Sequence, residues 1–126
     1  MRPILNGKEH LAPLPQSIDL IRSFVGGSLS ILVLLFLSQF THNIFIMAPF
    51  GATCVLLYAA SHSPLAQPRN VILGHLVSAF IGLLFLKFFG TPTLSIALSV
   101  GCAIAAMQLL RCVHPPAGAN PLVILL

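Results

Sequence analysis

The stretch IDLIRSFVGGSLSILVLLFLSQF, from Ile18 to Phe40, decides the fold class of this chain. As a helix it would be about 34 Å long, because an α-helix rises about 1.5 Å per residue. That length crosses the hydrocarbon core of a bilayer, about 30 Å thick, with some tilt. Its small residues would let a neighbouring helix approach closely; they are Gly26, Gly27, Ser28 and Ser30. The stretch therefore predicts a membrane-spanning helix.

The composition of the whole chain predicts an all-α, polytopic membrane protein. Of its 126 residues, 57% are hydrophobic and 6% are charged, whereas soluble domains carry about 25% charged residues. The net charge of +4 indicates contact with lipid headgroups rather than with nucleic acid. The only acidic residues are Glu9 and Asp19, so no carboxylate is expected in the membrane to relay protons or to bind hard cations. We assign residues 1–17 to a cytoplasmic N-terminal tail and residues 18–126 to a transmembrane domain.

Three further apolar segments follow the first span. Val71–Phe89 and Thr93–Leu110 each read as a span, while Ile44–Ala60 is split by a proline and a glycine. The uninterrupted part of that split segment, Phe50–Ala60, would make about 16 Å of helix, which is half a bilayer. We therefore expect a transmembrane helical bundle of about four spans, one of them a short broken helix.

The basic residues bear on whether the broken segment crosses the membrane or dips into it and returns. If it crosses, one side holds Arg2, Lys8, Arg22, Arg69 and Arg111, and the other side holds Lys87. If it returns, the division is four against two. Because basic residues concentrate in cytoplasmic loops, crossing is modestly favoured and the N-terminus is predicted to face the cytoplasm.

Two proline-containing stretches resemble each other and form a candidate inverted repeat. PFGATCVLL begins at Pro49 and PAGANPLVI begins at Pro116; at an offset of 67 residues both read P-x-G-A, followed by Thr53 or Asn120. With the broken segment and two further spans between them, the two stretches are expected on opposite sides of the membrane. Paired broken helices of this kind point to substrate sites in transporters. The match is short, so a chance similarity is the alternative.

The few polar residues near these breaks are the candidate substrate-binding groups. Arg111 and His114 would share a face if their helix continued that far, and backbone amides just beyond them would add donors. A donor-rich spot without acids suits a small anion. The predicted binding residues are Gly51, Thr53, His75, Arg111, His114, Gly118, Ala119 and Asn120. The alternatives are an interfacial anchor for Arg111, a backbone-bonded loop histidine for His114, and helix packing for His75.

No enzyme, metal or cofactor chemistry is evident in the pattern. The five histidines are scattered without carboxylates or cysteine pairs, which argues against metal ligation. The sequence contains no H-E-x-x-H, no G-x-S-x-G and no phosphate-binding glycine loop. We therefore expect no catalytic activity and no cofactor.

Three blocks of the sequence resemble the HPP family of integral membrane proteins. HPPAGA at His114–Ala119 resembles the family signature, and SPLAQPRNVILGH at Ser63–His75 and FGAT at Phe50–Thr53 are similar to its other shared blocks in order and spacing. The resemblance covers about residues 18–126 and implies a small helical bundle with four spans. It also implies a transporter role, with nitrite uptake proposed for cyanobacterial and plastid members.

The sequence departs from the family pattern after the signature. Relatives continue with a further apolar helix of the length that a span needs, whereas only Pro121–Leu126 follows here. The chain is therefore expected to be either a natural short form or a truncated piece of a longer protein.

These observations predict a transporter or channel for a small inorganic anion, with nitrite as the substrate that the resemblance implies. A non-transporting membrane subunit that binds a partner helix is the alternative. A proton-coupled role for His75 and His114 is a third reading, because histidine titrates near neutrality. We expect a homo-oligomer, since so few complete spans leave little room to enclose a path in a monomer. The predicted location is a bacterial inner membrane.

Overall fold

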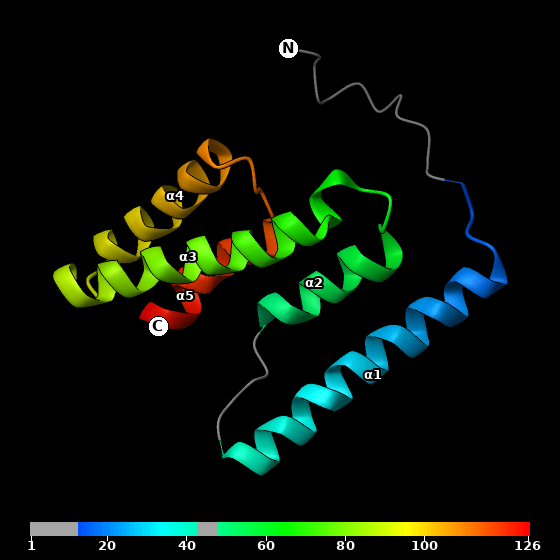
Figure 1. The fold of residues 1–126 in the computed structure, drawn as a ribbon. Helices are drawn as coiled ribbons and strands as arrows, with labels where there is room; N and C mark the ends of the chain where they lie inside the picture. The colour runs from blue at the N-terminus through cyan, green and yellow to red at the C-terminus, as the bar shows by residue number, and fades with distance from the viewer. Residues whose placement is uncertain (1–12, 43–47) are drawn as a thin grey trace.

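The computed structural model describes residues 13–42 and 48–126, and within these ranges the chain is helical throughout with short connectors. Most of the predicted N-terminal tail therefore lies outside the described residues. The α-helices are α1 (Ser17–Thr41), α2 (Ala48–Ala59), α3 (Pro68–Phe89), α4 (Thr93–Leu109) and α5 (Asn120–Leu125), and two 3₁₀ turns are η1 (Pro64–Ala66) and η2 (Pro115–Ala119). Figure 1 shows α3 running beside α4 and α5, with α1 set apart from them and packed on α2.

The predicted fold class is confirmed. Two helices, α1 and α3, are long and apolar enough to cross a membrane, and α2 and α4 are shorter apolar helices. Leucine, isoleucine, valine and phenylalanine side chains on all four of these helices are exposed, as expected for surfaces that face lipid tails. The first span agrees with its predicted limits within one residue at each end.

Two helices begin earlier than the sequence predicts, and proline explains both differences. The helix α2 begins at Ala48 rather than Phe50, and α3 begins at Pro68 rather than Val71. In each case a proline occupies one of the first two helical positions, where its missing N–H has no intrahelical partner to lose. Proline therefore opens these helices instead of preceding them.

The helix α2 returns along α1 toward the end where α1 began. The Tyr58 hydroxyl lies 2.7 Å from that of Ser30, and Ser23 donates a hydrogen bond of 2.9 Å to the Tyr58 carbonyl. A Cβ on Gly26 would meet the Tyr58 ring at 2.4 Å. Ser23 and Gly26 lie in the first half of α1 while Tyr58 is near the end of α2, and Figure 1 shows the two helices running antiparallel. This is the direction that the crossing arrangement requires.

A stripe of small residues on α3 receives the C-terminal segment. Gly74 faces His114, the Ser78 hydroxyl donates to the Ala117 carbonyl, and Gly82 faces Pro121. Small residues spaced four apart let two backbones approach closely. Because the partners advance in step along both segments, residues 114–125 run parallel to α3.

The two proline-containing helix starts lie side by side. Pro49 from α2 and Pro115 and Pro116 from η2 line one cavity of about 550 Å³. The expectation that the two stretches lie on opposite sides of the membrane is therefore wrong for the helix starts themselves. The two short helices do run in opposite directions. Figure 1 shows α2 antiparallel to α3, whereas α5 runs parallel to α3.

Arg111 ends α4 in a left-handed conformation, with φ of 55°. The Arg111 amide bonds to the Gln108 carbonyl and the Cys112 amide to the Met107 carbonyl, at 3.1 and 2.9 Å. This pattern is a Schellman motif, and the accompanying contact between Met107 and Cys112 is buried. The motif favours glycine at the left-handed position because any Cβ is strained there.

We therefore expect Arg111→Gly to raise the free energy of unfolding by about 1 kcal/mol. The measurement is the midpoint of thermal unfolding in detergent. The matched control is Arg111→Ala, which removes the charge but retains the strained Cβ, so it should not raise the free energy of unfolding. Equal behaviour of the two variants would show that the conformation of Arg111 is not strained.

Candidate functional site

Four polar side chains meet inside the bundle, brought there by α2, by α3 and by the C-terminal stretch 114–125. Thr53 comes from α2, His75 from α3, His114 from the approach to η2, and Asn120 from the start of α5. His114 is completely buried, and Thr53 and Asn120 are each 7% exposed. We call these four residues the central cluster. It lies where the broken helices meet, so groups that the sequence separates widely share one buried site.

The Thr53 hydroxyl joins the two histidines of the central cluster. Its oxygen lies 3.0 Å from His75 Nε2, 2.9 Å from His114 Nε2 and 2.9 Å from the Pro49 carbonyl. A hydroxyl carries a single proton to donate. Thr53 can therefore donate either to His114 or to Pro49, but not to both at once.

Asn120 determines which nitrogen of His75 carries the proton. The Asn120 amide nitrogen lies 3.0 Å from His75 Nδ1 and 3.2 Å from the His75 carbonyl. A carbonyl only accepts, so the NH₂ group must be the part of the amide that faces it. The Asn120 NH₂ then donates to His75 Nδ1 as well, which leaves the proton of the neutral ring on Nε2. His75 Nε2–H accordingly donates to Thr53.

His114 completes a continuous series of hydrogen bonds. Its Nδ1 lies 3.0 Å from the Leu65 carbonyl, which requires Nδ1 to donate. In the neutral ring Nε2 must then accept, and Thr53 is the donor. The donations therefore run in one direction, from Asn120 through His75, Thr53 and His114 to Leu65. The two imidazole rings also pack edge to face, with centroids 5.1 Å apart.

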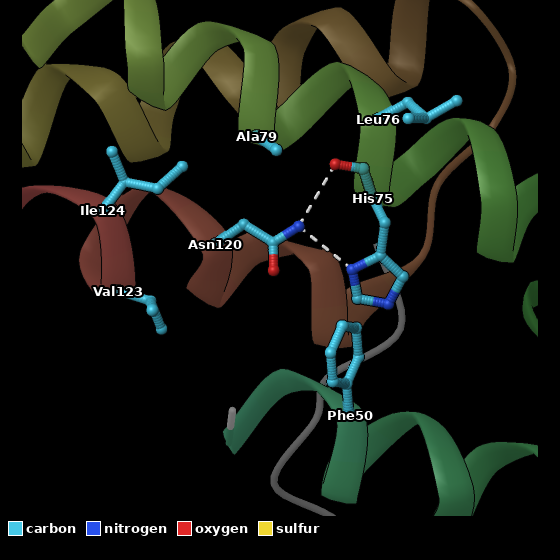
Figure 2. Close-up of a pocket in the computed structure, with 7 residues that line it drawn as sticks. All are labelled: Phe50, His75, Leu76, Ala79, Asn120, Val123 and Ile124. Carbon is cyan, nitrogen blue, oxygen red and sulfur yellow. Dashed lines mark hydrogen bonds between the residues drawn. The ribbon is translucent and has the colours of Figure 1, made fainter. Parts of the chain in front are cut away.

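A cavity of about 230 Å³ opens beside the central cluster. It is lined by Phe50, His75, Leu76, Ala79, Asn120, Val123 and Ile124, and Figure 2 shows the Phe50 and His75 rings together at one side of it. Its wall is apolar except for two members of the central cluster. A small molecule in this cavity would touch His75 and Asn120 directly.

Half of the predicted binding residues meet in the central cluster, and the others lie around or away from it. A Cβ on Gly51 or on Gly118 would meet no atom within 4 Å, so neither glycine is needed for packing. Ala119 lines the 550 Å³ cavity between the helix starts. Arg111 is exposed beyond the end of α4, and that helix stops at Leu109, so Arg111 and His114 do not share a helical face.

Sequence reasoning missed three groups that support the site. The Leu65 carbonyl is a backbone group, and no side-chain pattern points to it. Phe50 lies with its ring centroid 5.5 Å from that of His75, and it opens the FGAT block, in which the sequence predicts only Gly51 and Thr53 as binding residues. Asn70 donates a hydrogen bond of 2.8 Å to the Val113 carbonyl, which fixes the backbone just before His114.

The offset between the two proline stretches has a counterpart in the cluster. Thr53 and Asn120 are the residues that an offset of 67 aligns, and they bond to opposite nitrogens of the same imidazole, each at 3.0 Å. The two stretches thus supply residues at equivalent positions that both bond to His75.

In the described part of the chain, no group of three histidine, cysteine, aspartate or glutamate residues could hold a metal ion.

These features define a multi-pass helical membrane protein with a buried polar centre at broken helices. The chain belongs to the HPP family, because the model of the HPP transmembrane region matches residues 12–126. The family resemblance seen in three short blocks of the sequence is thereby confirmed.

Two transmembrane proteins of Dictyostelium discoideum are similar to this chain. One is 42% identical over 85 residues, which is 64% of this chain and 27% of that protein. The other is 30% identical over 125 residues, which is 93% of this chain and 44% of that protein. The chain thus spans less than half the length of these curated relatives. No solved structure matches it.

Proposed function

We propose that this chain forms the substrate-binding part of a transporter or channel for a small inorganic anion, with nitrite as the first substrate to test. The observation that carries the proposal is the central cluster, in which Thr53, His114 and Asn120 lie buried and His75 lies half-buried where two broken helices meet. Buried polar groups in a membrane bundle are costly and are usually functional. Broken helices at such a position are typical of transporter sites.

The absence of acidic groups near the cluster favours an anion over a cation. Among the residues that the structure describes, the single acidic one is Asp19, at the start of α1. A cation pathway normally uses carboxylates or several carbonyl oxygens. The proposal therefore rests on an uncharged polar centre that does not repel an anion by charge.

Two variants that keep side-chain volume should lower nitrite uptake by about tenfold or more, which corresponds to one buried hydrogen bond or more. They are Thr53→Val and His75→Gln, measured as nitrite uptake into vesicles that contain the purified protein. His62→Ala is the control, because His62 is exposed in a connector. Arg111→Ala tests the predicted contribution of Arg111. Unchanged uptake in Thr53→Val, His75→Gln and Arg111→Ala, with all three proteins folded, would remove the anion-transport proposal.

The second candidate is a non-transporting subunit that binds a partner helix. It is favoured by α1, which has no buried residue in the described chain although its face is apolar along its length. A partner helix, from another protein or from a second copy, would cover that face. Purified protein without anion flux that co-purifies in fixed ratio with another membrane protein would support this candidate over transport.

Orientation, assembly and location belong to the same proposal. Arg69 donates to the Leu110 carbonyl at 3.2 Å, so Arg69 and Arg111 lie at one end of the bundle, and the antiparallel pairing of α1 with α2 brings Arg22 to that end as well. We infer that this end faces the cytoplasm, that the protein is a homo-oligomer and that it is not an enzyme. A bacterial inner membrane stays a prediction, since the two relatives come from a eukaryote.

A further inference from the structure

The amide oxygen of Asn120 is the one buried side-chain polar atom, among the described residues, without a hydrogen-bond partner. The residue is 7% exposed, and its NH₂ group is held by His75 Nδ1 and the His75 carbonyl. Turning the amide over would place oxygen against the His75 carbonyl oxygen, so the orientation is determined. Figure 2 shows the oxygen directed away from α3, into the space between Val123 and Phe50.

This oxygen determines which ligand the 230 Å³ cavity can take. The other polar side chain in the wall is His75, and both of its nitrogens already have partners within the cluster. The side-chain atom left to recognise a ligand is thus an acceptor. A bare anion would place its negative charge against a carbonyl oxygen in an otherwise apolar cavity, which is unfavourable. A ligand with an O–H group would satisfy the oxygen and bring no net charge.

We propose that this cavity binds the neutral conjugate acid of a weak-acid anion, with its O–H donating to Asn120 Oδ1. The inference rests on the proposed function and names the form in which that substrate is bound. Each anion then enters together with one proton, so transport is electroneutral. Anions of weak acids are accepted, whereas anions of strong acids lack a protonated form at working pH and are excluded.

The groups that could disturb this selection are few. The titratable side chains at the cluster are His75 and His114, and both are held in hydrogen bonds. The described residues of α2, α3 and α5 contain no carboxylate that could face Asn120. The Asn120 oxygen is therefore the group that selects the neutral acid over its anion.

The test compares nitrite and formate with nitrate and chloride in vesicles that contain the full chain and a luminal pH dye, after subtraction of the rate in protein-free vesicles. We expect nitrite and formate to acidify the lumen, with rates that do not change when potassium and valinomycin set the membrane potential. The uptake of nitrate and chloride should be slower than that of nitrite by about tenfold or more. Nitrate and chloride uptake as fast as that of nitrite, accompanied by current, would overturn the inference and leave the anion-transport proposal standing. No uptake of any of the four anions would overturn both.

Two variants test whether the cavity itself carries the flux. Asn120→Leu removes the acceptor at similar volume, together with the NH₂ that donates to His75, whereas Ala79→Val narrows the cavity and leaves the hydrogen bonds of the cluster in place. Each should reduce weak-acid flux by about tenfold, while Ala105→Val, on an exposed face of α4, should not. If Asn120→Leu fails to fold, Ala79→Val decides alone. Full nitrite flux in folded Ala79→Val would mean that the cavity holds only water, and the inference would be wrong.

Discussion

Gly74→Val should unfold this protein or lower its thermal midpoint more than valine at any other glycine of the described residues. A Cβ built on Gly74 lies 2.7 Å from the His114 Cβ and 3.0 Å from the Cys112 carbonyl oxygen. The second contact is with backbone, which cannot move aside as the end of a flexible side chain can. We expect a loss of about 3 kcal/mol or more, because the C-terminal segment would have to separate from α3.

The control for this prediction is Gly101→Val on α4. A Cβ there meets no atom within 4 Å, and the position is exposed. Thermal unfolding of both variants in detergent, followed by helical circular dichroism, is the measurement. If both glycines tolerate valine equally, α3 and the C-terminal segment do not approach as closely as the structure has them.

His114→Ala should be the most damaging change among the histidines. The side chain is fully buried, and it bonds to Thr53 and to the Leu65 carbonyl. Its removal would leave a cavity and would leave the Leu65 carbonyl without its side-chain partner, so we expect a loss of about 3 kcal/mol or more in the free energy of unfolding. His62→Ala, in the exposed connector, should change it by less than about 0.5 kcal/mol.

A double-mutant cycle separates the hydrogen bond from the loss of packing at His114. Thr53→Val, His114→Ala and the double variant should show a coupling energy between about 0.5 and 3 kcal/mol, as expected for two residues of one network. Additive effects, with no coupling, would contradict the hydrogen bond between Thr53 and His114.

Much of the site could be anticipated from polarity alone. In an apolar sequence, the rare polar residues inside membrane segments are costly unless they are paired. That argument selects His75, His114, Thr53 and Asn120, which the structure brings together. The same argument selects Arg111, which lies exposed beyond α4 because that helix ends in a left-handed turn. A local turn conformation of this kind has no signal in residue polarity.

The sequence by itself determined the class of protein. Hydropathy and helix length are local properties, and lipid satisfies any apolar side chain that faces it, so spans such as α1 could be located within about a residue. Only the tertiary structure decided how the cluster is connected. Hydrogen-bond partners depend on which helices pack, and the close contact of Gly74 with His114 sets that packing. In that packing Thr53 and Asn120 bond to opposite nitrogens of His75, and the Asn120 amide oxygen is left without a hydrogen-bond partner.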